Sequence, residues 1–317
     1  MSTNIIQIAR RGARAQTSQH RSVVARAVTR RDLGFAGVSC MVTVVLSGVL
    51  GGSVGAAQAQ EVIMAPQGDV PPIPVQRPIR KVFVAGATGQ TGRRIVLELR
   101  AQGYDVVAGC RDEQKGLSLG LGRDPKVSVV QADVTSSPET IAEVIRGCDA
   151  IICATGFRPL DSKNSSTKVD LEGTLHLVEA AKMVDIDRFV LVTSLLTNGR
   201  ALGQEKNPNF SFLNSGFFGA ILDKKHEAEE YLVASGLNYT IVRPGGLSNE
   251  ATGTLGAVRF FPADALLGLD SEPGREISRD DVAAVCVEAL ENSRADKKTV
   301  EIVDVAGEAP LEKRQWF

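Results

Sequence analysis

Residues 81–92 read Lys-Val-Phe-Val-Ala-Gly-Ala-Thr-Gly-Gln-Thr-Gly. The first five residues have the apolar, β-branched composition of a buried strand, and residues 91–102 continue with the apolar period of a helix. Between strand and helix stand three glycines spaced G-x-x-G-x-x-G, namely Gly86, Gly89 and Gly92. Glycines there let the backbone turn tightly and bring a pyrophosphate against amide groups at the positive end of a helix. This order of strand, glycine turn and helix predicts a binding site for a nicotinamide dinucleotide.

The alternation of strand and helix continues almost to the end of the chain. Apolar runs predict buried parallel strands at residues 81–85, 105–110, 127–131, 150–154, 188–193, 238–243 and 299–303. Stretches of helical period lie at residues 91–102, 137–146, 171–184, 221–235 and 278–291. Such alternation implies βαβ units. We therefore predict an α/β fold with a doubly wound parallel sheet, an NAD(P)-binding Rossmann fold. It forms a single domain over residues 80–305, followed by a C-terminal tail at residues 306–317.

The expected cofactor site takes its residues from the carboxyl ends of these strands. Asp133 follows the third strand and is placed to meet the adenine. After the fourth strand come small residues, which a close approach of the backbone to the cofactor requires. Besides the glycines and Asp133, the predicted cofactor-binding residues of these turns are Thr88, Gln90, Thr91, Ala154, Thr155 and Gly156.

The residue after the second strand favours NADP(H) over NAD(H). A site for NAD usually has an acidic residue about twenty positions after the glycines, where it binds the ribose 2′-hydroxyl. Here Cys110 and Arg111 hold that place. A guanidinium is suited to a 2′-phosphate, so Arg111 is predicted to bind it. Asp112 is the counter-argument, because a shift of the alignment would restore an acid.

Charge and cysteine content exclude several other classes of protein. The 317 residues carry a formal net charge of -1, but residues 1–59 hold seven arginines and one acidic residue, so the remainder is acidic. An acidic body without a basic stripe argues against nucleic-acid binding. The five cysteines show no spacing typical of zinc sites or disulfide frameworks, and we expect no metal.

The first 59 residues have the composition of a targeting leader. They are rich in Arg, Ser and Ala, which is typical of an organelle transit peptide. Arg30-Arg31, an uncharged apolar run and Ala57-Gln58-Ala59 then resemble a twin-arginine export signal, which in a plastid points to the thylakoid and its lumen. The alternatives are a retained membrane anchor, a stromal protein and a mitochondrial address. Residues 60–79 contain five prolines and are expected to be an extended linker.

Five strings within residues 80–305 resemble the NmrA-like group of atypical short-chain dehydrogenase/reductases. They are Val-Ala-Gly-Ala-Thr-Gly-Gln-Thr-Gly (84–92), Ile-Cys-Ala-Thr-Gly-Phe-Arg-Pro (152–159), Lys-Val-Asp-Leu-Glu-Gly-Thr (168–174), Arg-Phe-Val-Leu-Val-Thr-Ser (188–194) and Ser-Gly-Leu-Asn-Tyr-Thr-Ile-Val-Arg-Pro-Gly-Gly-Leu (235–247). The chain looks most similar to plastid members described as flavin-reductase-related, which are associated with thylakoids and plastoglobules. The resemblance thus implies a plastid location with possible lipid-body association.

The resemblance also identifies candidate catalytic residues, with one departure from the family's pattern. Typical short-chain dehydrogenases use a Tyr-x-x-x-Lys pair and a serine. Ser194 matches the serine and Lys225 matches the lysine, which would also bind the cofactor, but the tyrosine position holds Ile221. The segment after the sixth strand should pass over the nicotinamide, which adds Arg243, Pro244 and Gly245 to the predicted cofactor-binding residues.

Ile221 restricts the reactions to be expected, because it has no proton to give. Hydride transfer to a conjugated acceptor such as a flavin or quinone is less demanding than carbonyl reduction, since water can supply the proton later. We therefore expect an NADPH-dependent reductase of such an acceptor, with residues 248–274 as a loop that covers the substrate. The alternatives are a non-catalytic NADP(H)-sensing or assembly protein at the thylakoid and, least favoured, an ordinary alcohol or sugar-nucleotide dehydrogenase.

Overall fold

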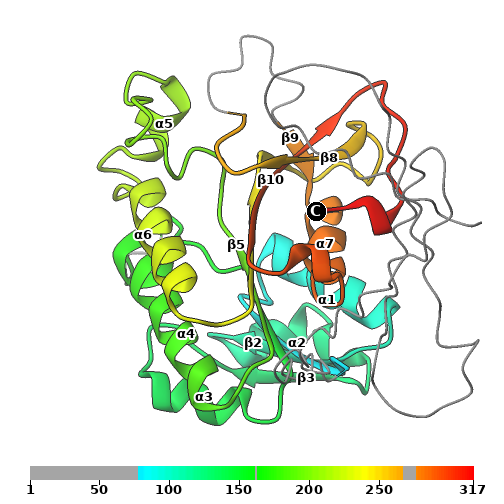
Figure 1. Cartoon of the computed structure of the whole chain (residues 1–317). Coiled ribbons are helices and arrows are strands. Elements are labelled where there is room, and N and C mark those ends of the chain that lie inside the picture. The colour runs from blue at the N-terminus through cyan, green and yellow to red at the C-terminus, as the bar shows by residue number, and fades with distance from the viewer. Residues whose placement is uncertain (1–77, 161–162, 267–275) are drawn as a thin grey trace, which may run out of the picture. The chain divides into compact units, whose positions relative to one another are not determined.

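The computed structural model describes residues 78–160, 163–266 and 276–317. The predicted leader and the linker up to residue 77 lie outside these ranges, so nothing is said of their structure. The described chain contains one large sheet with strand order β3-β2-β1-β4-β5-β6-β10-β8 (Figure 1). Its strands are β1 (Lys81–Ala85), β2 (Asp105–Cys110), β3 (Val127–Gln131), β4 (Ala150–Cys153), β5 (Arg188–Val192), β6 (Tyr239–Pro244), β8 (Ala257–Pro262) and β10 (Lys298–Val305).

Strand β1 illustrates why the sheet is covered on both faces. Successive side chains of a strand point to opposite faces, and all but the first residue of β1 are buried. Val82 and Val84 belong to a core that includes residues of α1 (Gln90–Ala101) and α7 (Arg279–Glu288). Phe83 and Ala85 belong to a second core. It includes residues of α3 (Pro138–Ile145), α4 (Gly173–Met183) and α6 (Ile221–Ala234).

The layers are therefore helix, sheet and helix, with α3, α4 and α6 on one side of the sheet and α1 and α7 on the other (Figure 1). All neighbouring strands from β3 to β10 pair in parallel, and β8 adds an antiparallel edge through its pairing with β10. The predicted α/β fold with a doubly wound parallel sheet in a single domain is confirmed.

Other elements were not predicted, because they are short or depend on distant partners. They are α2 (Glu113–Ser118), the 3₁₀ turns η2 (Leu121–Arg123), η4 (Ser293–Ala295) and η5 (Lys313–Gln315), the π-helix η3 (Thr167–Glu172), α5 (Pro208–Leu213), and the strands β7 (Gly246–Ser248) and β9 (Glu276–Ser278), which pair with each other.

The segment predicted to cover the substrate is in part a strand of the sheet. β8 lies within it and pairs with β10, with Phe260 opposite Ile302. The ring of Phe260 lies 5.3 Å from Trp316 and 5.2 Å from Phe317. The prediction of a covering loop is therefore wrong for β8, and the supposed tail packs on the domain through Trp316, which is 7% exposed. Residues 267–275 lie outside the described chain.

A buried ionic network joins β6, α6, β10 and the segment after β8. The Arg243 guanidinium donates from Nε and Nη2 to the two oxygens of Glu229, at 3.1 and 2.7 Å. Its Nη1 donates to Asp264 Oδ1 at 2.7 Å and lies 3.7 Å from Glu301 Oε1. Arg243 was predicted to contact the cofactor, but its guanidinium is held by these carboxylates. The sequence could not reveal this, because all three partners are distant in the chain.

We predict that Arg243→Met destabilises the fold by about 3–5 kcal/mol, because it leaves the buried Glu229 carboxylate without its counter-charge. Chemical denaturation of the variant measures this. Arg200→Met is the matched control, since Arg200 forms an ion pair with Asp223 at 2.6 Å but its side chain is 61% exposed. The control should unfold at the parent's midpoint. Equal effects of the two changes would contradict a structural role specific to Arg243.

Candidate functional site

The glycine turn holds α1 against the end of β1 at a distance that admits no side chain. A Cβ added to Gly92 would lie 2.2 Å from the Gly86 carbonyl oxygen. Gly86 itself has a φ of +79°, and a Cβ there would lie 2.9 Å from the Ala154 carbonyl oxygen. The turn is closed by a hydrogen bond from the Gly89 amide to the Gly86 carbonyl, at 2.8 Å. Close backbone approaches thus require glycine at positions 86 and 92, in addition to the positive φ of Gly86.

The N-terminus of α1 is open toward the strand ends. Gly89 is its N-cap and supplies no side-chain hydrogen bond to the first turn. The first amides of a helix have no partner within the helix and carry the positive end of its dipole. They form a place where a phosphate group can be bound.

Two adjoining cavities lie at the carboxyl ends of the parallel strands, near β1 and β4, where the strand order of the sheet reverses. The first, of about 120 Å³, is lined by Gly86, Thr88, Gly89, Arg111, Asp133 and Ala154–Arg158 among others, and we call it the Arg111 pocket. The second, of about 360 Å³, is lined by Gly89–Thr91, Ala154–Arg158, Ser194, Ile221 and Lys225 among others, and we call it the Lys225 pocket. Residues 154–158 line both pockets, so the two form one cleft across the strand ends.

Cationic side chains line the Arg111 pocket from two sides. Arg111 and Lys115 come from the segment after β2, and Arg158 comes from the segment after β4. The acidic Asp133 also lines the pocket, but its Oδ1 accepts hydrogen bonds from the amide and the hydroxyl of Thr135, each at 2.9 Å. Its carboxylate therefore holds its own turn, and the pocket keeps a positive balance. Lys115 and Arg158 were not predicted, because only the folded chain shows that they share this cavity.

Asp112, the acid that argued for NAD(H), has a local structural role. Its Oδ1 accepts the Lys115 amide at 3.0 Å and caps α2. It does not line the Arg111 pocket, whereas its neighbour Arg111 does.

A buried ion pair fixes the lysine of the second cavity. Lys225 Nζ lies 2.8 Å from Asp170 Oδ1, and the Asp170 side chain is fully buried. The other oxygen, Oδ2, accepts the Phe157 amide at 3.1 Å. Asp170 stands in the π-helix η3 and connects the lysine with the backbone that lines both pockets. Sequence reasoning missed Asp170, although an acid within the apolar Val-Asp-Leu of residues 169–171 is a signal that could have found it.

The structure brings Ser194 and Ile221 into the wall of the Lys225 pocket, as the resemblance implied. All three tyrosines of the chain are described, and none lines either pocket. Tyr231, on α6, donates its hydroxyl to Glu179 on α4 at 2.6 Å. Pro244 and Gly245 do not line the cleft, and the nearby Leu247 does instead. Leu247 was not predicted, nor was Arg279, which lines the cavity from the start of α7.

Among the described residues, no group of three or more His, Cys, Asp or Glu side chains is placed to hold a metal ion. Within the same part of the chain, no helix has the length and apolarity needed to cross a membrane.

The arrangement of this cleft agrees with what comparison of the whole chain finds. Residues 86–293 match the profile of a family described as NAD(P)H-binding. The chain belongs to this NAD(P)H-binding family. The resemblance to NmrA-like atypical short-chain dehydrogenase/reductases is thereby confirmed.

Relatives of the chain include proteins of plastids and cyanobacteria. An uncharacterized chloroplastic protein of Arabidopsis thaliana is 49% identical over 233 residues, which cover 73% of this chain and 79% of the relative. A photosystem II assembly factor of Synechocystis is 28% identical over 70% of this chain and 62% of its own length. A solved structure, a putative NAD-dependent epimerase/dehydratase from Bacillus halodurans, is 27% identical with a TM-score of 0.60. The match covers 74% of this chain and 97% of that one.

We predict that Gly92→Ala weakens NADPH binding about tenfold or more and costs about 1–3 kcal/mol of stability, because the new methyl group displaces the phosphate-binding turn. Isothermal titration with NADPH and thermal unfolding measure the two effects. Gly216→Ala is the matched control, since a Cβ at Gly216 meets no atom within 4 Å. NADPH binding by the Gly92 variant with the parent's affinity would show that the cofactor does not lie against this turn.

Proposed function

We propose that the protein is an NADPH-dependent reductase that passes hydride to a conjugated acceptor of the flavin or quinone type. The observation that carries the proposal is the composition of the Lys225 pocket. Ile221 stands in its wall one helical turn before Lys225, and no tyrosine, histidine or acidic residue of the described chain lines it. Bound NADPH would supply hydride, and this chain offers no tyrosine hydroxyl beside it for rapid protonation of an alkoxide.

The residues of the pocket have separate roles in this proposal. Lys225, held by Asp170 at 2.8 Å, binds the ribose of the nicotinamide half through its ammonium group. Ser194 orients the acceptor from the end of β5. Leu213, Ile221 and Leu247 provide apolar surface against a flat ring system. A conjugated acceptor delocalises the negative charge that the hydride brings, so the one proton that completes the reduction can come from water afterwards.

The proposed preference for NADP(H) depends on charge in the Arg111 pocket. Three cations line it, and a 2′-phosphate adds two negative charges that a 2′-hydroxyl lacks. Asp112, which could have bound a 2′-hydroxyl, is used as a helix cap. We propose that Arg111 binds the 2′-phosphate directly.

Arg111→Ala is predicted to weaken NADPH about 10- to 100-fold, the effect of losing charge-assisted hydrogen bonds, and NADH by no more than about twofold. Dissociation constants for both cofactors, measured by titration calorimetry, test this. Arg123→Ala is the matched control, because Arg123 lies on η2 and does not line the pocket. If both cofactors lose affinity equally, the 2′-phosphate is not bound by Arg111.

The reductase itself is tested by mixing the purified chain with NADPH and a panel of free flavins and quinones. At least one acceptor should give enzyme-dependent loss of nicotinamide absorbance. Lys225→Met should lower kcat/KM by about 100-fold, since the loss of a positioned cationic group costs about 3 kcal/mol. Lys224→Met should not, because Lys224 pairs with Glu227 and lies outside the pocket lining. Inactivity with the entire panel would argue against a reductase.

The second candidate is a non-catalytic NADP(H)-sensing or assembly protein at the thylakoid. It is favoured by Ile221 and by the likeness to a photosystem II assembly factor. Two observations together would distinguish it from a reductase. A stoichiometric partner should co-purify with the protein and be released by NADPH but not by NADP⁺, and no acceptor should be reduced.

We further propose that the protein acts in the plastid. The support is its chloroplastic relative and the composition of residues 1–59. Association with thylakoids or plastoglobules, and the choice between stroma and lumen, are part of the same proposal and can be tested by fractionation of plastids that express the full chain.

A further inference from the structure

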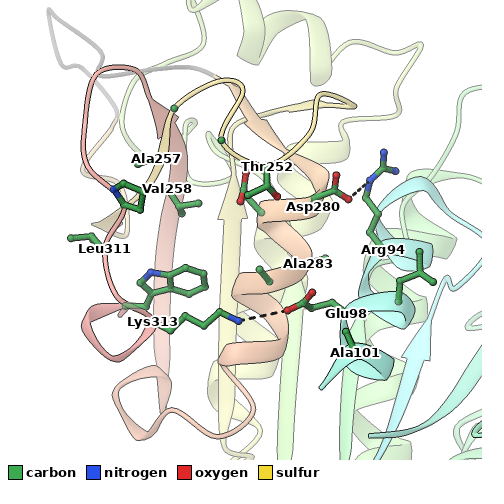
Figure 2. A pocket seen from close by; sticks show the side chains of 17 residues that line it. Arg94, Glu98, Ala101, Thr252, Ala257, Val258, Asp280, Ala283, Leu311 and Lys313 are labelled. Atoms are coloured by element: carbon green, nitrogen blue, oxygen red, sulfur yellow. Dashed lines mark ion pairs between the residues drawn. The ribbon is translucent and has the colours of Figure 1, made fainter. Parts of the chain in front are cut away.

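A third cavity lies along α1, beyond the first turn that borders the cofactor cleft. It has a volume of about 630 Å³ and is walled by α1, α7, β8 and the C-terminal segment around η5 (Figure 2). None of its lining residues lines the Arg111 pocket or the Lys225 pocket. It is therefore separate from the proposed reductase site.

Most of the wall of this cavity is apolar. Val258 from β8, Ala283 from α7 and Leu311 and Trp316 from the C-terminal segment line it. Leu97 of α1, which is 66% exposed, also lines it. The volume lies in the range of about 300–1,000 Å³ that is typical of small-molecule sites.

The charged residues at the rim form pairs. Arg94 Nε lies 2.8 Å from Asp280 Oδ1, and Lys313 Nζ lies 3.6 Å from Glu98 Oε1, as the dashed lines in Figure 2 show. Each pair joins α1 to another wall of the cavity, so the rim charges largely cancel.

A fifth charged side chain, that of Asp281, also lines the cavity, and one of its two oxygens lacks a hydrogen-bond donor among the described residues. Asp281 is 4% exposed, and its Oδ2 has no hydrogen-bond partner in the described chain. Burial, together with the neighbouring Asp304 carboxylate, raises the pKa of Asp281 to about 6. A buried carboxylate oxygen without a donor is costly. A donor brought by a ligand would remove that cost.

We propose that this cavity, the Asp281 pocket, binds a small amphiphile whose apolar body lies against Leu97 and Trp316 and whose head group donates a hydrogen bond to Asp281. The head is cationic or neutral and carries no negative charge, because Asp281 is the one lining charge that the rim pairs leave without a counter-ion among the described residues. This site is independent of the cofactor cleft and of the reaction proposed there.

The chain contains a natural reporter for the test. Trp316 is its single tryptophan, and it lines the Asp281 pocket. Octylamine, 1-octanol and octanoate are unbranched compounds with the same number of carbon atoms. They do not absorb where tryptophan does, and their head groups differ in charge. Their effect on tryptophan emission is measured with the full chain at about pH 8, where octylamine is protonated and both Asp281 and octanoate are ionised.

Each of the three compounds should bind in the pocket and shift the emission of Trp316. Their affinities should differ according to the charge of the head group. Octylamine should bind at least about tenfold more tightly than octanoate, with octanol between them, because a close opposite charge is attracted and a like charge repelled. Asp281→Asn should bring octylamine and octanoate to within about twofold of each other, since the amide carries no charge. The shift should occur with or without NADPH.

A second variant keeps Asp281 and fills part of the pocket with a larger side chain. Ala101 is the exposed last residue of α1 and lines the pocket, so Ala101→Phe should weaken all three compounds. Ala234 is the exposed last residue of α6 and lines no cavity described above, and Ala234→Phe should leave binding unchanged. Retained NADPH binding shows that each variant is folded. The proposal is overturned if no compound gives a saturable shift, if octanoate binds as well as octylamine, or if Asp281→Asn leaves the order of affinities unchanged.

Discussion

The structure depends on a close approach of backbone to backbone. The Gly86 carbonyl oxygen occupies the place where a side chain of residue 92 would begin, 2.2 Å from the position of a Cβ. This contact sets how near α1 can lie to the end of β1, and thereby aims the first amides of the helix at the strand ends. The cofactor cleft at the first turn of α1 and the packing of α1 with α7 in one core both depend on this position of the helix.

Those parts of the molecule that depend on neighbouring residues could be predicted from the sequence. Seven strands of the sheet and the glycine turn were predicted because apolar runs and glycine spacing are local signals. The clustering of Arg111, Asp133 and residues 154–156 in one pocket followed from the rule that parallel strands end at the same edge. The fold and the class of cofactor could therefore be predicted from the sequence.

What could not be predicted depends on contacts between distant segments. Arg243 has a family motif around it, yet its partner Glu229 comes from another element, so its structural role appears only in the fold. β8 pairs with the edge strand β10. Its valine and phenylalanines are typical of a strand, but the glycines and prolines around it indicated a loop. Asp170 gains its role when α6 brings Lys225 within 2.8 Å. In each case the deciding partner lies more than ten residues away.

The two proposed binding sites differ in charge. Three cations from two segments line the Arg111 pocket, whereas the Asp281 pocket retains one buried carboxylate after its rim charges are paired. The positive site would therefore attract an anionic dinucleotide and the negative site a cationic amphiphile, so charge alone would direct each ligand to its own site.

The C-terminal segment has a practical consequence. Trp316 lies in the main core, Phe317 packs against Phe260, and Lys313 reaches Glu98 on α1. Residues 313–317 are therefore packed against the domain. A purification tag fused directly after Phe317 would place polar residues next to these contacts. A tag ahead of residue 78, or a long spacer after Phe317, would avoid this.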